Sequence, residues 1–189
     1  MIIAWSGPSG IGKGYIKETL TKAYPNVKEI AWFTTRALRP SELTKSNRCH
    51  ISEEELAKMM AKNELALVQG MFGHRYAVRK KDLLPRDGIF LTEIHPYVIE
   101  ESKEINPKII TIGLVTDDFE LLRERLADRR KTESEDEIKK RVDSAKAETA
   151  AIFENFRFYD EIINVARNNE HLIANIALDI FAKYQEEGD

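Results

Sequence analysis

Short apolar runs alternate along this chain with longer stretches of mixed polarity. The apolar runs have strand length and predict strands at residues 2–5, 28–33, 88–94, 109–115 and 162–165. The mixed stretches have helical spacing and predict helices at residues 15–24, 53–62, 96–103, 118–130, 134–156 and 171–184. Strands that alternate with helices form a parallel sheet with helices on both faces, so the pattern predicts an α/β fold.

The middle of the chain departs from this alternation. Two short strand-like runs, residues 65–69 and 74–78, flank a turn at residues 70–73, which predicts a small antiparallel insert. Ahead of them, Ser52 and Glu55 have the spacing of a capping box, so we expect a helix to begin after Ser52.

Composition narrows the class of protein. The chain has 189 residues, of which 42% are apolar and 32% charged, which suits one compact domain. A net charge of −3 argues against a protein that coats nucleic acid or binds membranes through a basic surface. Cys49 has no second cysteine to pair with, and no apolar run reaches membrane-spanning length, so we expect a reducing cytoplasm. The histidines lack metal-ligand spacing, and no metal site is assigned to them.

The first predicted strand leads into a glycine-rich turn, and this turn gives the clearest indication of function in the sequence. Residues 7–13 fit G-x-x-x-x-G-K, the phosphate-binding loop or P-loop, and lie between a strand and a helix as that motif requires. Glycines let backbone N–H groups approach a polyphosphate, and Lys13 can reach its terminal phosphates; we expect Lys13 to face solvent until the nucleotide arrives. The sequence therefore predicts ATP binding. The expected cofactor-binding residues are Gly7, Pro8, Ser9, Gly10, Ile11, Gly12, Lys13, Gly14 and Tyr15.

This loop lacks the hydroxyl side chain that usually binds the metal ion. The residue after Lys13 is usually a Ser or Thr that ligates Mg²⁺, but here it is Gly14, followed by Tyr15. We therefore expect Mg²⁺ to be held mainly by nucleotide phosphates and water, with help from a carboxylate elsewhere.

A second candidate phosphate site follows the second predicted strand. Arg36 and Arg39 lie three residues apart beside Thr35, and paired guanidinium groups suit a phosphate ligand. The alternative is a solvated loop whose arginines pair with acidic side chains.

Taken together, these motifs resemble the guanylate kinase family. The resemblance rests on the P-loop, Thr-Thr-Arg-x-x-Arg-Pro-x-Glu at residues 34–42, Gly-x-x-Tyr at 73–76, Arg-Leu-x-x-Arg at 125–129, and Arg141. It implies a P-loop NTPase fold and an ATP-dependent kinase that transfers the γ-phosphoryl group to a small phosphorylated acceptor, most simply a nucleoside monophosphate. Arg36, Arg39 and Tyr76 would bind the acceptor phosphate, while Lys13, Arg129 and Arg141 would be catalytic.

The resemblance also implies how the single domain, residues 1–189, is divided. The expected parts are a core at residues 1–33, 86–117 and 157–189, an acceptor-binding subdomain at 34–85, and a helical lid at about 118–145 that hinges near 131–133.

This chain differs from the family at the positions that bind the guanine base in the family. Leu67 stands where an acidic residue is expected to accept hydrogen bonds from the base, and Trp32 replaces a serine. Arg48 aligns with a phosphate-contacting tyrosine, and Glu93 is the acid nearest to an expected aspartate; Arg48, Glu93 and Thr35 complete the expected acceptor site. These departures predict that GMP is a poor substrate.

Two other interpretations remain open. Residues 65–67 and the run Asn-x-x-His-Ile at 47–51 also resemble ribose 1,5-bisphosphate phosphokinases, which act on a sugar phosphate. The missing P-loop hydroxyl also fits a catalytically silent binding module of the guanylate kinase fold.

Overall fold

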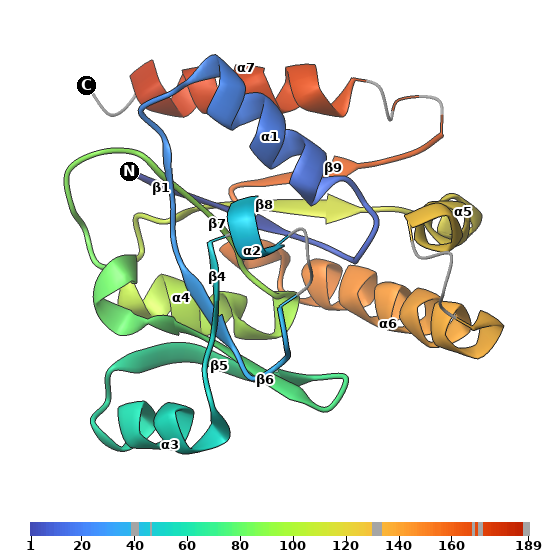
Figure 1. Ribbon diagram of the computed structural model, residues 1–189. Coiled ribbons are helices and arrows are strands. Elements are labelled where there is room, and N and C mark those ends of the chain that lie inside the picture. The colour runs from blue at the N-terminus through green and yellow to red at the C-terminus, as the bar shows by residue number, and fades with distance from the viewer. Residues whose placement is uncertain (39–41, 46, 130–133, 168, 170–171, 187–189) are drawn as a thin grey trace.

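The computed structural model describes residues 1–38, 42–45, 47–129, 134–167, 169 and 172–186. Its core is a five-stranded sheet in the order β2-β7-β1-β8-β9, in which every neighbouring pair is parallel (Figure 1). The strands are β2 (Lys28–Glu29), β7 (Phe90–Glu93), β1 (Ile2–Ser6), β8 (Ile110–Val115) and β9 (Glu161–Asn164). The predicted α/β fold with a parallel sheet is therefore confirmed.

The central strand β1 is buried along its whole length, and its side chains alternate between two apolar clusters. Ile3 and Trp5 belong to a cluster formed with helices on one face of the sheet, including α1 (Lys13–Ala23) and α7 (Ile173–Glu186). Ile2 and Ala4 belong to the cluster on the other face, which includes Ile99 at the start of α4 (Ile99–Ile105). Figure 1 shows α1 and α7 together on one side and α4 on the other.

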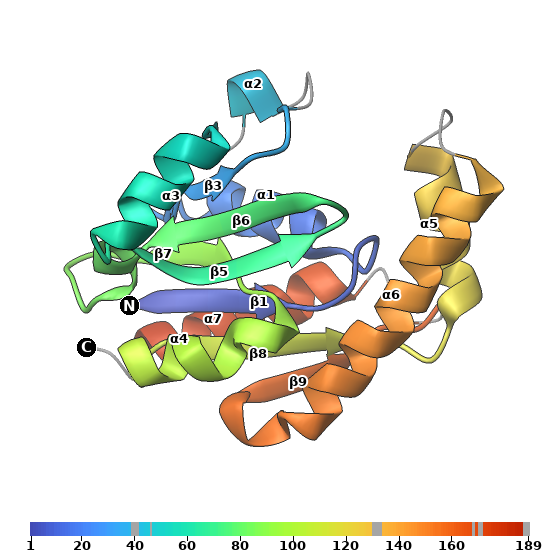
Figure 2. The same ribbon diagram turned by 90° about the horizontal axis from the view of Figure 1, so that it is seen from below.

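A second sheet of four strands covers part of the α4 side, in the order β4-β3-β6-β5. Its hairpin is antiparallel as predicted, and Figure 2 shows it lying across the core sheet. The other pairs are β3 with β6, antiparallel, and β3 with β4, parallel. The strands are β3 (Trp32–Thr34), β4 (Arg48–His50), β5 (Leu65–Met71) and β6 (His74–Arg79).

The predicted strand at residues 28–33 was wrong in one respect. Its two ends lie in different sheets, β2 in the core and β3 in the second sheet, and Ile30 and Ala31 connect them. Because Ile30 and Trp32 are both buried, the segment remains apolar across the connection and has the pattern of one strand. The pattern also missed β4 and the short helix α2 (Glu42–Lys45).

The predicted helices are present, with small shifts at their ends. The capping box is confirmed at α3 (Glu53–Ala61): Ser52 Oγ accepts from the Glu55 N–H, and a Glu55 carboxylate oxygen accepts from the Ser52 N–H. Residues 96–103 are a 3₁₀ turn, η2 (Pro96–Val98), followed by α4. The charged segment forms α5 (Phe119–Arg129) and α6 (Glu135–Glu154), and the expected hinge at 131–133 lies outside the described residues. Two further 3₁₀ turns are η1 (Lys80–Leu83) and η3 (Phe156–Phe158).

A β-bulge in β5 decides which side chains of this strand face the core. The register between β5 and β6 shifts between Ala66 and Gln69, and Leu67 has a φ of 53°. The Leu67 side chain is fully buried, and its N–H donates to a carboxylate oxygen of Glu101 at 2.9 Å. Leu67 is therefore a core residue.

A polar junction that is partly open to solvent holds β8 to the segment that precedes β9, since the Asp160 side chain is 35% exposed. One carboxylate oxygen of Asp160 accepts from the Thr111 N–H at 2.7 Å, from the Thr111 hydroxyl at 2.9 Å and from the Lys103 ammonium at 2.8 Å. Burial alone would raise the pKa of Asp160, but these three donors outweigh it and hold the pKa below its usual value.

We predict that Asp160→Asn destabilises the protein at neutral pH by about 1 kcal/mol, because the Thr111 and Lys103 donors lose a charged acceptor that is screened in part by solvent. A depressed folded-state pKa stabilises the fold above the unfolded-state pKa and ceases to do so as the pH falls through the folded-state value. The difference between variant and wild type should therefore be full at pH 7 and shrink below about pH 4. Urea unfolding at both pH values measures it, with the exposed Asp143→Asn as a control. A pH-independent difference would contradict the assignment.

We also predict that Leu67→Glu unfolds or severely destabilises the chain, by about 3 kcal/mol or more, because it buries a carboxylate without a partner. Leu67→Met, which preserves volume, should cost less than about 1.5 kcal/mol. Thermal and urea denaturation of the two variants provide the comparison. A stably folded Leu67→Glu protein would show that residue 67 faces the solvent or the cavity.

Candidate functional site

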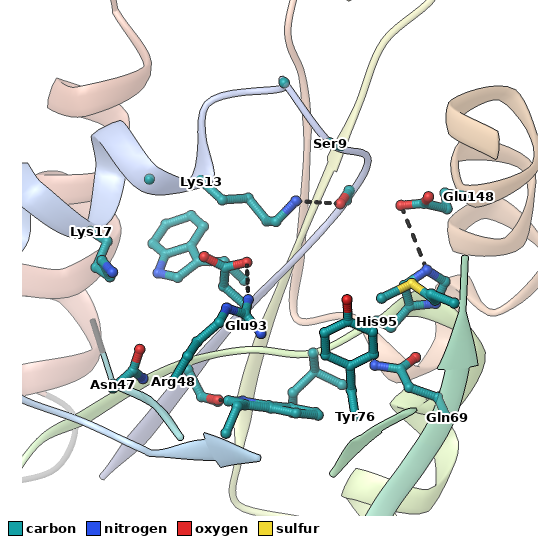
Figure 3. Close-up of a pocket in the computed structure, with 18 of the residues that line it drawn as sticks. Ser9, Lys13, Lys17, Asn47, Arg48, Gln69, Tyr76, Glu93, His95 and Glu148 are labelled. Atoms are coloured by element: carbon teal, nitrogen blue, oxygen red, sulfur yellow. Dashed lines mark hydrogen bonds and ion pairs between the residues drawn. The ribbon is translucent and has the colours of Figure 1, made fainter. Parts of the chain in front are cut away.

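A cavity of about 730 Å³ lies where the carboxyl ends of β1 and β7 meet the second sheet and α6. Ligands of open parallel sheets bind outside the carboxyl ends of the strands, so this is the position that the fold favours for a site. Figure 3 shows side chains from both sheets and from α6 pointing into the space. Six of the nine residues predicted to bind ATP line it: Gly7, Ser9, Gly10, Gly12, Lys13 and Gly14.

The P-loop has the backbone geometry that its sequence predicts. Gly7 has a φ of 147°, and a Cβ at this position would lie 2.5 Å from the Leu114 carbonyl oxygen of β8. Only glycine fits there, because that contact is backbone and cannot move aside. Gly12 has a φ of 123° and is the residue from which α1 begins. The loop therefore ends at a helix N-terminus, whose positive end favours an anion.

Lys13 does not extend into solvent, so that expectation was wrong. Its side chain is half-buried, and its ammonium group donates to the carbonyl oxygens of Gly7 at 2.6 Å and Pro8 at 3.0 Å. Carbonyl dipoles stabilise a half-buried cation, which explains the inward position.

The other three predicted ATP residues lie off the cavity wall. Pro8 and Ile11 are buried within the loop. Tyr15 is exposed and lines a separate hollow with Arg125 and Asp128. Arg125 donates to the carbonyl oxygens of Gly10 and Ile11, at 3.2 and 3.3 Å, and so links α5 to the P-loop. This role of Arg125 was not predicted, because its place in the sequence motif does not indicate a backbone partner.

The predicted acceptor residues gather opposite the P-loop, and Arg36, Arg48, Tyr76 and Glu93 all line the cavity. Arg36 contacts both carboxylate oxygens of Glu42, at 2.8 and 2.7 Å. Burial lowers the pKa of Arg36, but hydrogen bonds with Glu42 and Tyr76 raise it by more, so the guanidinium stays charged.

Arg48 lies between acids and an aromatic ring. Its guanidinium is 3.8 Å from a Glu42 oxygen, 3.7 Å from a Glu93 oxygen and 5.9 Å from the centre of the Tyr76 ring. Thr35 is not part of the cavity wall, and its hydroxyl accepts from the Arg75 N–H. Arg39 lies outside the described residues.

One of the two predicted lid arginines is placed by the structure. Arg141 of α6 lines the cavity, and its guanidinium lies 4.8 Å from the centre of the Phe72 ring at the tip of the β5–β6 hairpin. This contact joins the second sheet to α6 across the cavity mouth. Arg129 is the last residue of α5, and its side chain lies outside the described part of the chain.

The part of the cavity wall that was expected to bind the acceptor base differs from the prediction. Leu67 is in the core and does not line the cavity. Trp32 does line it, and its indole N–H donates to the Thr92 hydroxyl at 2.8 Å, so that both polar groups already have a partner.

Three polar residues that the motif analysis did not assign complete this wall: Gln69, His95 and Glu148. His95 follows β7 at the same sheet edge as Glu93, which is the one signal that pointed to it. Gln69 and Glu148 carried no signal, because the bulge and the facing of α6 depend on tertiary packing.

The described residues offer neither a metal-ligand cluster nor a membrane-spanning helix. Within them, no group of three or more His, Cys, Asp or Glu side chains could hold a metal ion. None of the helices in the described part of the chain is long and apolar enough to cross a membrane.

Comparison with known proteins agrees with this geometry. The sequence model of the guanylate kinase family matches residues 1–174. The guanylate kinase of Clostridioides difficile is 29% identical over 180 residues, covering 93% of this chain and 87% of that protein. The guanylate kinase of Carboxydothermus hydrogenoformans is 30% identical over 166 residues, covering 86% and 79%.

Solved structures show the same fold. A crystal structure of guanylate kinase from Anaplasma phagocytophilum superposes with a TM-score of 0.70 at 20% identity, covering 98% of this chain and 86% of that one. The match of the family model over most of the chain, together with the P-loop at the edge of the parallel sheet, shows that this protein belongs to the guanylate kinase family.

Proposed function

We propose that this protein is an ATP-dependent kinase that transfers the γ-phosphoryl group to a nucleoside monophosphate. The observation that carries the proposal is one cavity with the P-loop on one wall and the cluster of Arg36, Arg48 and Tyr76 on another. Phosphoryl transfer needs donor and acceptor phosphates in line, and it is catalysed mainly by positioning and by neutralising charge. Kinase activity is also the function named for the curated relatives.

The loop fits ATP through its backbone. Positive φ angles at Gly7, Gly10 and Gly12 give the loop a concave backbone surface that suits phosphate groups. The N-terminus of α1 adds the positive end of the helix dipole to this surface. Lys13 would exchange the carbonyl oxygens of Gly7 and Pro8 for the terminal phosphates, so its present contacts keep it folded over the loop until the nucleotide binds.

The metal requires a different arrangement from the usual one. Gly14 has no hydroxyl, and Tyr15 faces away from the cavity, so Mg²⁺ would be held by nucleotide phosphates and water with a carboxylate such as Glu93 nearby. When bound, Mg²⁺ would neutralise charge on the transferring phosphate.

The acceptor phosphate would bind between Arg36 and Arg48, with the Tyr76 hydroxyl beside it, and the sequence adds Arg39. Both arginines are now paired with Glu42, and a phosphate would compete with that carboxylate. Arg141 and, from the sequence, Arg129 would supply positive charge at the transferring group as the lid closes.

Among the alternatives, a sugar-phosphate kinase shares every phosphate-binding group above and differs only at the wall that reads the base. A silent binding module is disfavoured because Lys13 and the glycines of the loop serve no purpose in binding a phosphopeptide. The expectation that GMP is a poor substrate rested on Leu67 and Trp32. Leu67 does not line the cavity, so only Trp32 of these two residues can contact an acceptor, and the low activity towards GMP stays a prediction. An ATP-consumption screen across nucleoside monophosphates and ribose phosphates with Mg²⁺ tests all three functions.

We predict that Lys13→Ala lowers kcat for the best acceptor by at least about 100-fold, because a charge that stabilises the transition state is removed. The melting temperature should change little, since Lys13 contacts only its own loop. Lys22→Ala, on an exposed turn of the same helix, is the matched control. Turnover of Lys13→Ala within a few-fold of wild type would contradict the kinase assignment.

We further predict that a bisubstrate analogue, an ATP-like and a monophosphate nucleoside joined through phosphates, slows hydrogen exchange in residues 118–145. Exposed ion pairs of Arg123 with Glu120 and Glu135 contribute to the link between the two helices of this segment, and such pairs add little stability. Mass-spectrometric hydrogen exchange with and without the analogue measures the effect, with α7 as an internal reference. Equal exchange in both states would rule out lid closure.

A further inference from the structure

The wall of the cavity beside Tyr76 carries three polar side chains that belong to three different elements. Gln69 comes from β5, His95 follows β7, and Glu148 is on α6. Figure 3 shows Gln69 next to Tyr76, and Glu148 facing His95. Neither the P-loop chemistry nor the proposed phosphate-binding cluster uses any of the three.

Gln69 faces the cavity because of the bulge in β5. The register shift between Ala66 and Gln69 leaves Leu67 in the core and pairs Gln69 with Tyr76 of β6, so both lie on the cavity wall. The side-chain carbonyl oxygen of Gln69 is buried, and no donor within the described residues reaches it. A buried acceptor without a donor costs about 1–3 kcal/mol, so a ligand that donates to it would be favoured.

His95 and Glu148 offer a second acceptor on the same wall. The Tyr97 N–H donates to His95 Nδ1 at 3.4 Å, which places the proton of the neutral ring on Nε2. Nε2 lies 3.7 Å from Glu148 Oε2, too far for a hydrogen bond, whereas Ser144 donates to Glu148 Oε1 at 2.9 Å. Glu148 Oε2 therefore retains capacity to accept, although the side chain is only 8% exposed.

We propose that Gln69 and Glu148 bind the end of the acceptor that is remote from its phosphate and determine specificity, with His95 beside the Glu148 carboxylate. Both contribute acceptor oxygens to the lining of the cavity, so they would select an acceptor with paired hydrogen-bond donors. This inference rests on the proposed kinase function. Recognition of the acceptor is thereby assigned to α6 and to the bulged strand β5, and not to position 67.

Two parts of a nucleoside monophosphate can supply paired donors. A guanine edge carries a ring N–H and an amino group, whereas hypoxanthine carries the ring N–H alone. A ribose carries two adjacent hydroxyls, and its 2′-deoxy form carries one fewer. The ratio of kcat/KM for GMP and IMP therefore measures recognition through the base, and the ratio for GMP and dGMP measures recognition through the sugar.

The test compares both ratios in wild type, Gln69→Met and Glu148→Gln. We expect each variant to lower kcat/KM for the preferred acceptor by about 10- to 100-fold and to bring one of the ratios toward unity. The KM for ATP should stay within about two-fold of wild type, because the P-loop is untouched. Gln69→Met removes no internal bond from the buried oxygen, so its folding stability should be close to wild type.

Glu154→Gln, an exposed residue two turns further along α6, is the matched control and should leave both ratios unchanged. Wild-type ratios near unity, or ratios that stay within about two-fold of wild type in both variants, would overturn the inference. If wild type phosphorylates none of these acceptors, the kinase proposal fails, and calorimetric binding of the same nucleotides then tests the wall by itself. Binding that does not distinguish the nucleotides, or distinguishes them equally in wild type and both variants, would also overturn it.

Discussion

The close approach of the P-loop to β8 is the constraint on which the rest of the site depends. At Gly7 the backbone passes so near the Leu114 carbonyl oxygen that no side chain fits between them. The approach is possible because β1 is buried at every position and pairs with both β7 and β8, which fixes where its carboxyl end lies. Trp5 at that end, Glu93 beside it and the loop beyond then face one cavity. Burial of a single strand thus determines where the nucleotide-facing backbone turns.

The elements that depend on residues close together in the chain could be predicted from the sequence. The P-loop, the capping box at Ser52 and the antiparallel hairpin depend on residues close in the chain, and the structure has each of them. The split of residues 28–33 between two sheets was not predictable, because Ile30 remains buried across the connection. The role of position 67 was missed for a related reason: a bulge exchanges which side chains face inward, and single-sequence periodicity does not register it.

The residues of the candidate site also fall into those that the sequence could predict and those that it could not. The position of Arg36, Arg48, Tyr76 and Glu93 at the cavity could be predicted, because phosphate-binding chemistry limits the residue types and the resemblance supplied their order. Gln69 and Glu148 could not, because an amide on a strand and a carboxylate on a charged helix resemble ordinary surface residues. Only the packing of α6 against the carboxyl edge of the sheet turns Glu148 inward. The inward position of Lys13 is likewise a property of the folded loop, and its sequence motif does not contain that information.

The connection through Ile30 and Ala31 has a consequence for how such a protein diverges. Among the described residues, the second sheet packs on the core sheet through the cluster that contains Ile2 and Ala4. The cluster that supports α1 and α7 includes none of the described residues from positions 32–79. Substitutions in that insert can therefore accumulate without disturbing the support of the nucleotide loop. Lineages built on this plan are free to exchange the compound that receives the phosphate while they inherit the donor machinery unchanged.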